Sequence, residues 1–102
     1  MDMNALMRQA QNMQRQMAKK QKEVEEKEFV VSSNGGAIVI TIMGNKKVKK
    51  VEVDPDLLDK ENQEMFQDML AIAMNEAIEK VEKEMSEAMN SATGGMNIPG
   101  MI

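Results

Sequence analysis

The side chains that could do chemistry in this sequence are carboxylates, amines, guanidines, hydroxyls and amides, because it contains no histidine, cysteine, tyrosine or tryptophan. Histidine is the usual general base near neutral pH and the commonest metal ligand, and cysteine thiolates are common zinc ligands. Glu25, Glu26 and Glu28 lie close together, but without a histidine beside them we expect them to be solvated rather than to hold a metal. The composition therefore predicts a protein that is not an enzyme, with no cofactor and no small-molecule substrate.

Basic residues are concentrated in the first half of the chain, where they could bind phosphate. Residues 1–53 contain ten Lys or Arg and six acids, whereas residues 54–102 contain three and eleven, within a net charge of −4. A basic surface is typical of proteins that bind nucleic acid, so a net charge of −4 argues against such a partner for the chain as a whole, while the first half could bind phosphate and the second half should repel it. Such an asymmetry can also arise from two solvated helices of different composition.

Two groups of basic residues are candidate phosphate contacts. The first recurs every seven residues on one helix face, about 10.5 Å apart, and comprises Arg8, Arg15 and Lys22, with Lys19 and Lys20 nearby. Its other interpretation is a solvated face, or ion pairs with glutamates of a second helix. The second group is denser and comprises Lys46, Lys47, Lys49 and Lys50. Its other interpretation is an edge strand that lysines protect from aggregation.

Two long helices are predicted. Met3 to Lys27 has a narrow apolar seam at heptad spacing that suits one partner helix, formed by Met3, Leu6, Ala10, Met13, Met17 and Val24. Asp54-Pro55 is typical of a helix start and precedes a helix predicted from about Glu61 to Asn90. Residues 1–90 are therefore expected to form a single domain, and the Gly- and Met-rich residues 91–102 a flexible C-terminal tail.

Three strands are predicted between the helices: Glu28–Ser32, Ala37–Met43 and Lys46–Val53, with an Asn-Gly hairpin turn after the first. The apolar alternation of the third strand slips between Val48 and Val51, which indicates a bulge or a lysine-protected edge. The second strand is apolar on both faces, so we expect both to be covered, one by another copy of the chain. The candidate dimer-interface residues are Ile38, Val39, Ile40, Ile42, Val51 and Val53.

The order helix, three strands, long helix predicts an α+β fold with an antiparallel sheet. A seven-residue strand spans about 23 Å and a 30-residue helix about 45 Å, so the helices must extend beyond the sheet. The start of the first helix and the end of the second are expected to pair antiparallel as an arm. No signal peptide or membrane span is apparent, so we expect a cytoplasmic protein without a membrane partner.

Several segments, taken in order, resemble the YbaB/EbfC family of bacterial nucleoid-associated proteins. They are Met3-Asn4-x-Leu6-Met7-x-Gln9-Ala10-Gln11, Gly35-Gly36, Val51-x-Val53-Asp54-Pro55, Asp68-Met69-Leu70 and the run from Gly95 to Met101. The resemblance implies a tweezer-like homodimer whose sheets meet at the centre and whose projecting helical arms hold duplex DNA. It also implies a location in the nucleoid, a change in DNA conformation and an influence on nucleoid organisation and gene expression.

A second class of function stays open, in which the chain is a non-enzymatic scaffold that binds proteins through its Met-rich helices. Salt dependence distinguishes the two classes. Phosphate contacts release counterions, so the affinity for DNA should fall steeply with salt, whereas a methionine groove should be nearly indifferent.

Overall fold

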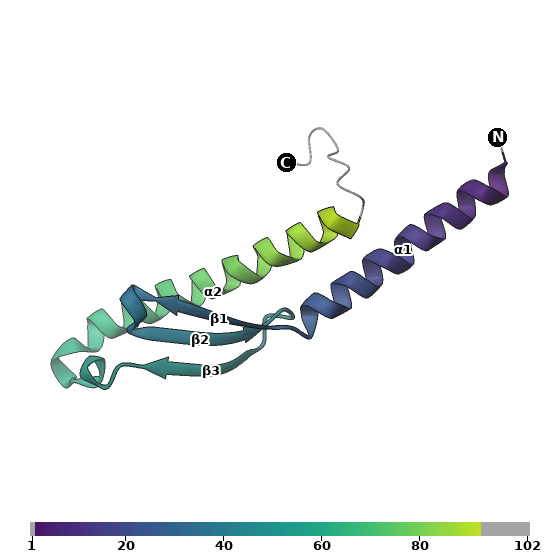
Figure 1. Ribbon diagram of the computed structural model, residues 1–102. Coiled ribbons are helices and arrows are strands. Elements are labelled where there is room, and N and C mark those ends of the chain that lie inside the picture. Colours follow the sequence, from purple (N-terminus) through teal and green to yellow (C-terminus); the bar gives the residue numbers. More distant parts are fainter. Residues whose placement is uncertain (1, 93–102) are drawn as a thin grey trace.

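The computed structural model describes residues 2–92 and has the predicted order of helix, three strands and long helix (Figure 1). Its main elements are α1 (Met3–Glu25), β1 (Glu28–Ser33), β2 (Ile38–Met43), β3 (Val48–Val53) and α2 (Gln63–Ala92). Ser91 and Ala92, which the sequence pattern places in the tail, form the last turn of α2. The rest of that tail lies outside the described residues.

The three strands form one antiparallel sheet in the order β1-β2-β3. Ile40 pairs with Val51, but Ile42 pairs with Val48, so β3 has one extra residue and the register shifts there. A β-bulge therefore explains the slip in the apolar alternation. It brings Val48 to the same sheet face as Val51, and β3 is also an edge of the sheet within the described chain.

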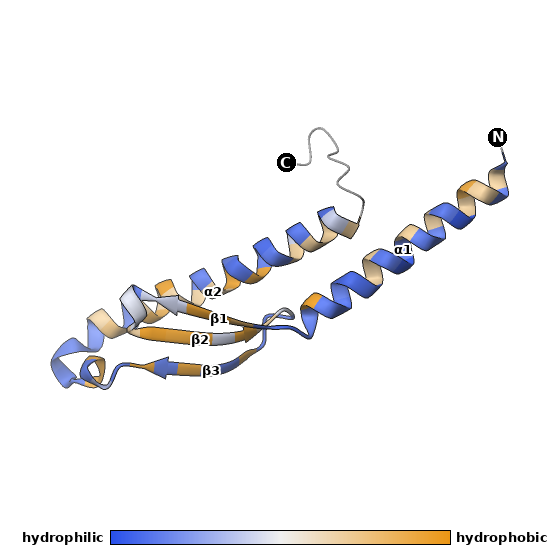
Figure 2. Cartoon of the chain, viewed as in Figure 1, coloured by the Kyte–Doolittle hydropathy of each residue, from blue (hydrophilic) through white to orange (hydrophobic). Residues whose placement is uncertain are grey.

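One face of the sheet packs against α2 and forms the core. Ile38, Ile40 and Ile42 have no exposed surface. They belong to one buried cluster with small residues of α2, among them Ala73 and Ala77, which allow the helix to approach closely. Figure 2 shows this apolar strand beside the apolar first half of α2. These three isoleucines were expected at a dimer interface, but α2 of the same chain covers them, so they cannot contact a partner while α2 is in place.

The opposite face of the sheet is more polar than its central strand suggests. Val39 is half-buried there, and Val30 on β1 is 68% exposed. The Nζ of Lys49 lies 2.5 Å from a carboxylate oxygen of Glu28, and that of Lys50 lies 3.2 Å from one of Glu52. Within residues 2–92 no helix packs on this face, so its predicted cover is not part of the described chain.

Two hairpin turns of the sheet form hydrogen bonds to α2 and to the end of α1. Asn34 opens the short 3-10 turn η1 (Asn34–Gly36) with a positive φ of 55°, and its Nδ2 donates to the carbonyl of Met69 on α2 at 3.0 Å. After β2, the amide of Gly44 donates to the Lys27 carbonyl at 2.9 Å, and that of Asn45 to the Glu25 carbonyl at 3.2 Å. The β2–β3 turn is thus bonded to the end of α1.

Helix α1 extends well beyond the sheet, and the molecule is 71 Å long (Figure 1). It runs antiparallel to α2, but the first turns of α1, which were expected to pair with the end of α2, extend beyond it. Lys20 and Ser91 line one small cavity, so α2 ends about level with Lys20. Met3, Leu6 and Met7 are accordingly 72%, 47% and 58% exposed. Within residues 2–92, the seam is therefore buried near the sheet, half-buried at Met13 and Met17, and exposed over its first turns.

Candidate nucleic-acid interface

The basic residues of α1 lie on one face of the helix. At about 100° per residue, four of the five candidates fall within an arc of about 60°. We call this set the basic stripe: Arg8, Arg15, Lys19 and Lys22, all of them exposed. Lys20 lies about 120° away from Arg8, and its Nζ is 3.9 Å from a carboxylate oxygen of Glu23 on the same helix.

The basic stripe points away from the rest of the molecule. Val24 belongs to the core and lies about 160° around the helix from Arg8. Arg8 Nε donates to the Asn4 carbonyl at 3.5 Å, but no stripe side chain forms an ion pair within residues 2–92. The predicted alternative of pairing with glutamates of the second helix is thus not realised in this part of the chain. The stripe presents four cations to solvent.

The second basic group is different, because three of its four lysines have acidic partners. Besides the pairs of Lys49 and Lys50 with Glu28 and Glu52, Lys46 Nζ lies 3.5 Å from a carboxylate oxygen of Glu82 on α2. Lys47 has no ion pair among the described residues. A phosphate would have to compete with these carboxylates, so the geometry favours the structural interpretation of this group and makes the stripe the stronger candidate.

The two helices have opposite charge. Helix α1 contains five basic and two acidic residues, whereas α2 contains two basic and seven acidic residues. Lys80 and Glu84 pair on α2, and the hydrogen bond and charge of Lys80 lower the pKa of Glu84 below its ordinary value of 4.5. Glu84 therefore stays ionised within this pair, whereas the excess of acidic over basic residues on α2 gives a field that disfavours an anionic partner on the side of α2.

Two further structural observations concern membranes and metals. Within residues 2–92, neither helix has an apolar stretch long enough to cross a bilayer. The same part of the chain contains no cluster of three or more side chains suited to bind a metal ion.

Comparison with known proteins gives the family. The family model described as the YbaB/EbfC DNA-binding family matches residues 1–96. The chain belongs to this family. The predicted resemblance is therefore confirmed over almost the whole sequence.

Curated bacterial relatives of this YbaB/EbfC member bear a consistent name. The chain is 45% identical to a nucleoid-associated protein of Clostridium novyi (strain NT), over all of this chain and 90% of that protein. It is 44% identical to one of Clostridium acetobutylicum, over 98% and 89% of the two chains. It is 45% identical to one of Alkaliphilus metalliredigens, over 99% and 89%. These names place the relatives at the nucleoid.

A solved structure has the same fold as this YbaB/EbfC chain. The crystal structure of an uncharacterized protein from Helicobacter pylori matches with a TM-score of 0.68 and covers 85% of this chain and 91% of its own. The two sequences are 22% identical, so this similarity supports the α-β-β-β-α fold alone.

Sequence reasoning placed the basic stripe but missed two features near it. The carboxylate partners of Lys46 and Lys49 lie 36 and 21 positions away in the sequence, so only the packed structure brings them together. It also missed Val48 as an exposed apolar residue, because the bulge reverses its face. The slip in alternation at this strand was the signal that could have identified Val48.

Proposed function

We propose that this chain is a nucleoid-associated protein that binds duplex DNA as a homodimer, through the basic stripe of α1. The observation that supports it best is the set of four exposed cations, without ion pairs in the described chain, on the outer face of a projecting helix. The membership of the chain in a family described as DNA-binding supports the same conclusion.

The dimensions of the stripe suit the backbone of a duplex. Arg8 and Lys22 are separated by 14 residues, or about 21 Å of helix, and B-DNA carries one negative charge per about 1.7 Å of its axis. Several phosphates thus lie within reach of the stripe. Contacts to phosphates do not read bases, so we expect binding to many sequences.

The proposed homodimer forms through the sheet at β3. Val48 and Val51 are 38% and 43% exposed on the sheet face that α2 covers elsewhere, and the half-buried Val53 is on the same face. A second copy that covers these valines removes an exposed apolar edge. The dimer has two basic stripes at a fixed separation, and a duplex that contacts both must follow their geometry. This is how binding alters DNA conformation, and with it nucleoid organisation and gene expression.

A gel-shift series over salt concentration tests the proposal. Arg8, Arg15, Lys19 and Lys22 are replaced together by Gln. We expect weaker binding to all duplexes, and a salt dependence whose slope falls by about one unit for each lost phosphate contact. The seam is unchanged, so the variant should keep its helical content.

The matched control replaces Lys46, Lys47, Lys49 and Lys50 by Gln, which removes the same number of charges. We expect a smaller loss of affinity, because three of these lysines have carboxylate partners. Wild-type affinity of the stripe variant would refute the proposed interface. Weak, salt-insensitive binding by the wild-type chain would instead favour the scaffold, with the exposed Met3, Leu6 and Met7 as its docking surface.

A further inference from the structure

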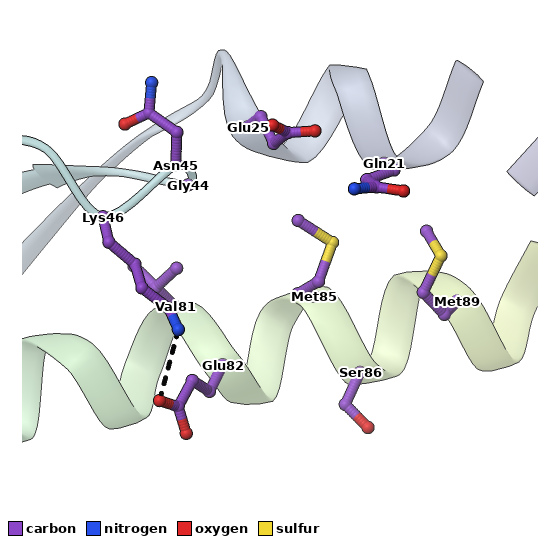
Figure 3. Close-up of a pocket in the computed structure, with 10 residues that line it drawn as sticks. All are labelled: Gln21, Glu25, Gly44, Asn45, Lys46, Val81, Glu82, Met85, Ser86 and Met89. Atoms are coloured by element: carbon purple, nitrogen blue, oxygen red, sulfur yellow. Dashed lines mark ion pairs between the residues drawn. The ribbon is translucent and has the colours of Figure 1, made fainter. Parts of the chain in front are cut away.

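A cavity of about 460 Å³ lies between α1, α2 and the turn that joins β2 to β3. Figure 3 shows Met85 and Met89 of α2 pointing toward α1, with Gln21 and Glu25 on the opposite wall. Val81 also lines the cavity from α2. The α1 residues that line the cavity, Gln21 and Glu25, lie about 140° and 100° around the helix from Arg8, so the DNA interface proposed above does not use it.

The lining favours an apolar, uncharged occupant. Two methionines form an adaptable apolar surface, and the side-chain amide of Gln21 can bond to peptide groups. The charged residues at its edge are Glu25, Glu82 and Lys46, and Lys46 is paired with Glu82. A phosphate or another anion would meet the remaining charge of Glu25, so nucleic acid is a poor occupant.

We propose that this cavity binds the chain's own segment Thr93–Ile102. The segment has no charged residue, and its sequence TGGMNIPGMI contains four large apolar side chains: Met96, Ile98, Met101 and Ile102. Helix α2 ends at Ala92, three residues after Met89. The end of the helix thus lies about 4.5 Å along the helix axis from Met89, at the near end of the cavity, and the segment follows directly.

The segment is long enough to fill the cavity if it reverses direction. Met89 and Val81 are eight residues apart, or about 12 Å along α2, whereas ten residues can extend to about 33 Å. Gly94-Gly95 follows Thr93, one residue past the end of the helix, and glycines can adopt the conformations that a reversal needs. Because the segment is tethered, its effective concentration is in the millimolar range, which favours it over a separate peptide.

An occupied cavity would connect three parts of the molecule. The bound segment contacts both helices and the β2–β3 turn, which itself is bonded to the end of α1. Its side chains fill space between the helices and fix the angle of α1 relative to the sheet. The bound segment thus restricts the movement of α1 relative to the sheet.

Methyl NMR tests the proposal. The chain is labelled at its methionine methyl groups and can still form the proposed dimer. The full chain is compared with a variant that ends at Ala92. We expect the signals of Met85 and Met89 to shift, while that of Met65, near the start of α2, stays in place. A second variant, Met96→Asp with Ile98→Asp in the full chain, should give the same shifts without truncation.

The peptide TGGMNIPGMI, added to the shortened chain, should restore the signals of Met85 and Met89. The same peptide with Asp in place of its first methionine and first isoleucine should bind at least about tenfold more weakly, since it places charge against methionines. Identical Met85 and Met89 signals in all variants would refute the proposal. A second result would also refute it. If unlabelled full chain restored the Met85 and Met89 signals of the labelled shortened chain but the peptide did not, the segment would bind a second copy rather than its own chain.

Discussion

The ion pair between Lys80 and Glu84 makes part of α2 sensitive to pH. Lys80 Nζ lies 2.9 Å from a carboxylate oxygen of Glu84 and lowers the pKa of that carboxyl. A group whose pKa is lowered by folding stabilises the folded chain above its ordinary pKa, and this contribution is lost as pH falls through the lowered value. We expect Lys80→Met to raise the pKa of Glu84 toward 4.5 and to reduce stability at neutral pH, but not at a pH below both values.

An NMR titration of the Glu84 carboxyl in each variant measures this effect. The control is Lys83→Met, since Lys83 has the weakest influence on the pKa of Glu84 among the groups that lower it. An unchanged pKa in the Lys80 variant would show that its hydrogen bond does not stabilise the carboxylate in solution.

The basic residues also show what can be predicted from the sequence at the scale of single residues. The spacing of Arg8, Arg15 and Lys22 placed them on one helix face, because helical geometry is local and fixed by the sequence interval. The pairing of Lys49 with Glu28 was not predictable, because it depends on the bulge in β3 and crosses the width of β2. The sequence therefore identified the candidate phosphate contacts, and the tertiary structure was needed to show which of them have acidic partners.

At the scale of elements, Gly44 holds α1 against the sheet. A Cβ atom at this position would overlap the Val24 carbonyl oxygen, which is part of the backbone and cannot rotate away. We expect Gly44→Ala to destabilise the chain by about 1–3 kcal/mol, the usual cost of overpacking. Urea denaturation measures the change.

The control for this prediction is Gly35→Asn in the first turn. Gly35 has a φ of 68°, which Asn tolerates better than most residues, and a Cβ atom added there would have no other atom within 4 Å. A small change there, together with a large one at Gly44, would identify the contact with α1 as the cause. Equal stability of the Gly44 variant and the wild type would contradict the close packing of this turn.

The helices and strands follow their sequence signals closely, except where short turns intervene. Asp54 was expected to begin the second helix, and its carboxylate does accept from the Asp56 amide at 3.0 Å. That cap begins a 3-10 turn, η2 (Pro55–Leu58), and a second turn, η3 (Lys60–Asn62), precedes α2. Asn62 Nδ2 donates to the Asp56 carbonyl, and this contact between turns has no periodic signal in the sequence.

At the scale of the whole molecule, the proposed dimer predicts a specific effect of charge at β3. Val51 is 43% exposed in the single chain, so Val51→Glu should fold. In the dimer the new carboxylate would be buried without a partner, which costs several kcal/mol. We expect the dissociation constant to rise by about a hundredfold or more. Analytical ultracentrifugation at micromolar concentration measures it.

Val30→Glu is the matched control, since Val30 is 68% exposed on the opposite face of the sheet and should tolerate a charge in the dimer. If the Val30 variant dissociates and the Val51 variant does not, the partner covers the other face. A wild-type chain that is monomeric at these concentrations would remove the proposed dimer altogether.

The two apolar faces of β2 predicted that both faces of the sheet are covered, and within the described chain α2 covers one of them. Ile40 is buried by α2 of its own chain, whereas it was expected at the interface. A strand pattern records only that a side chain avoids water. It does not distinguish the same chain from a second copy, so the sequence alone could not separate the interface residues from the core.

The uncovered start of α1 implies a gradient of order along the arm. Asp2 caps the helix, its carboxylate accepting from the Asn4 amide at 3.0 Å, but α2 lends no packing to the turn around Arg8. Helical turns without tertiary contacts open and close readily. A phosphate bound at Arg8 therefore restricts a fluctuating turn and loses conformational entropy, whereas one bound at Lys22 meets a turn already fixed. In the proposed complex with DNA, the phosphate contacts should therefore strengthen from the tip of α1 toward the sheet.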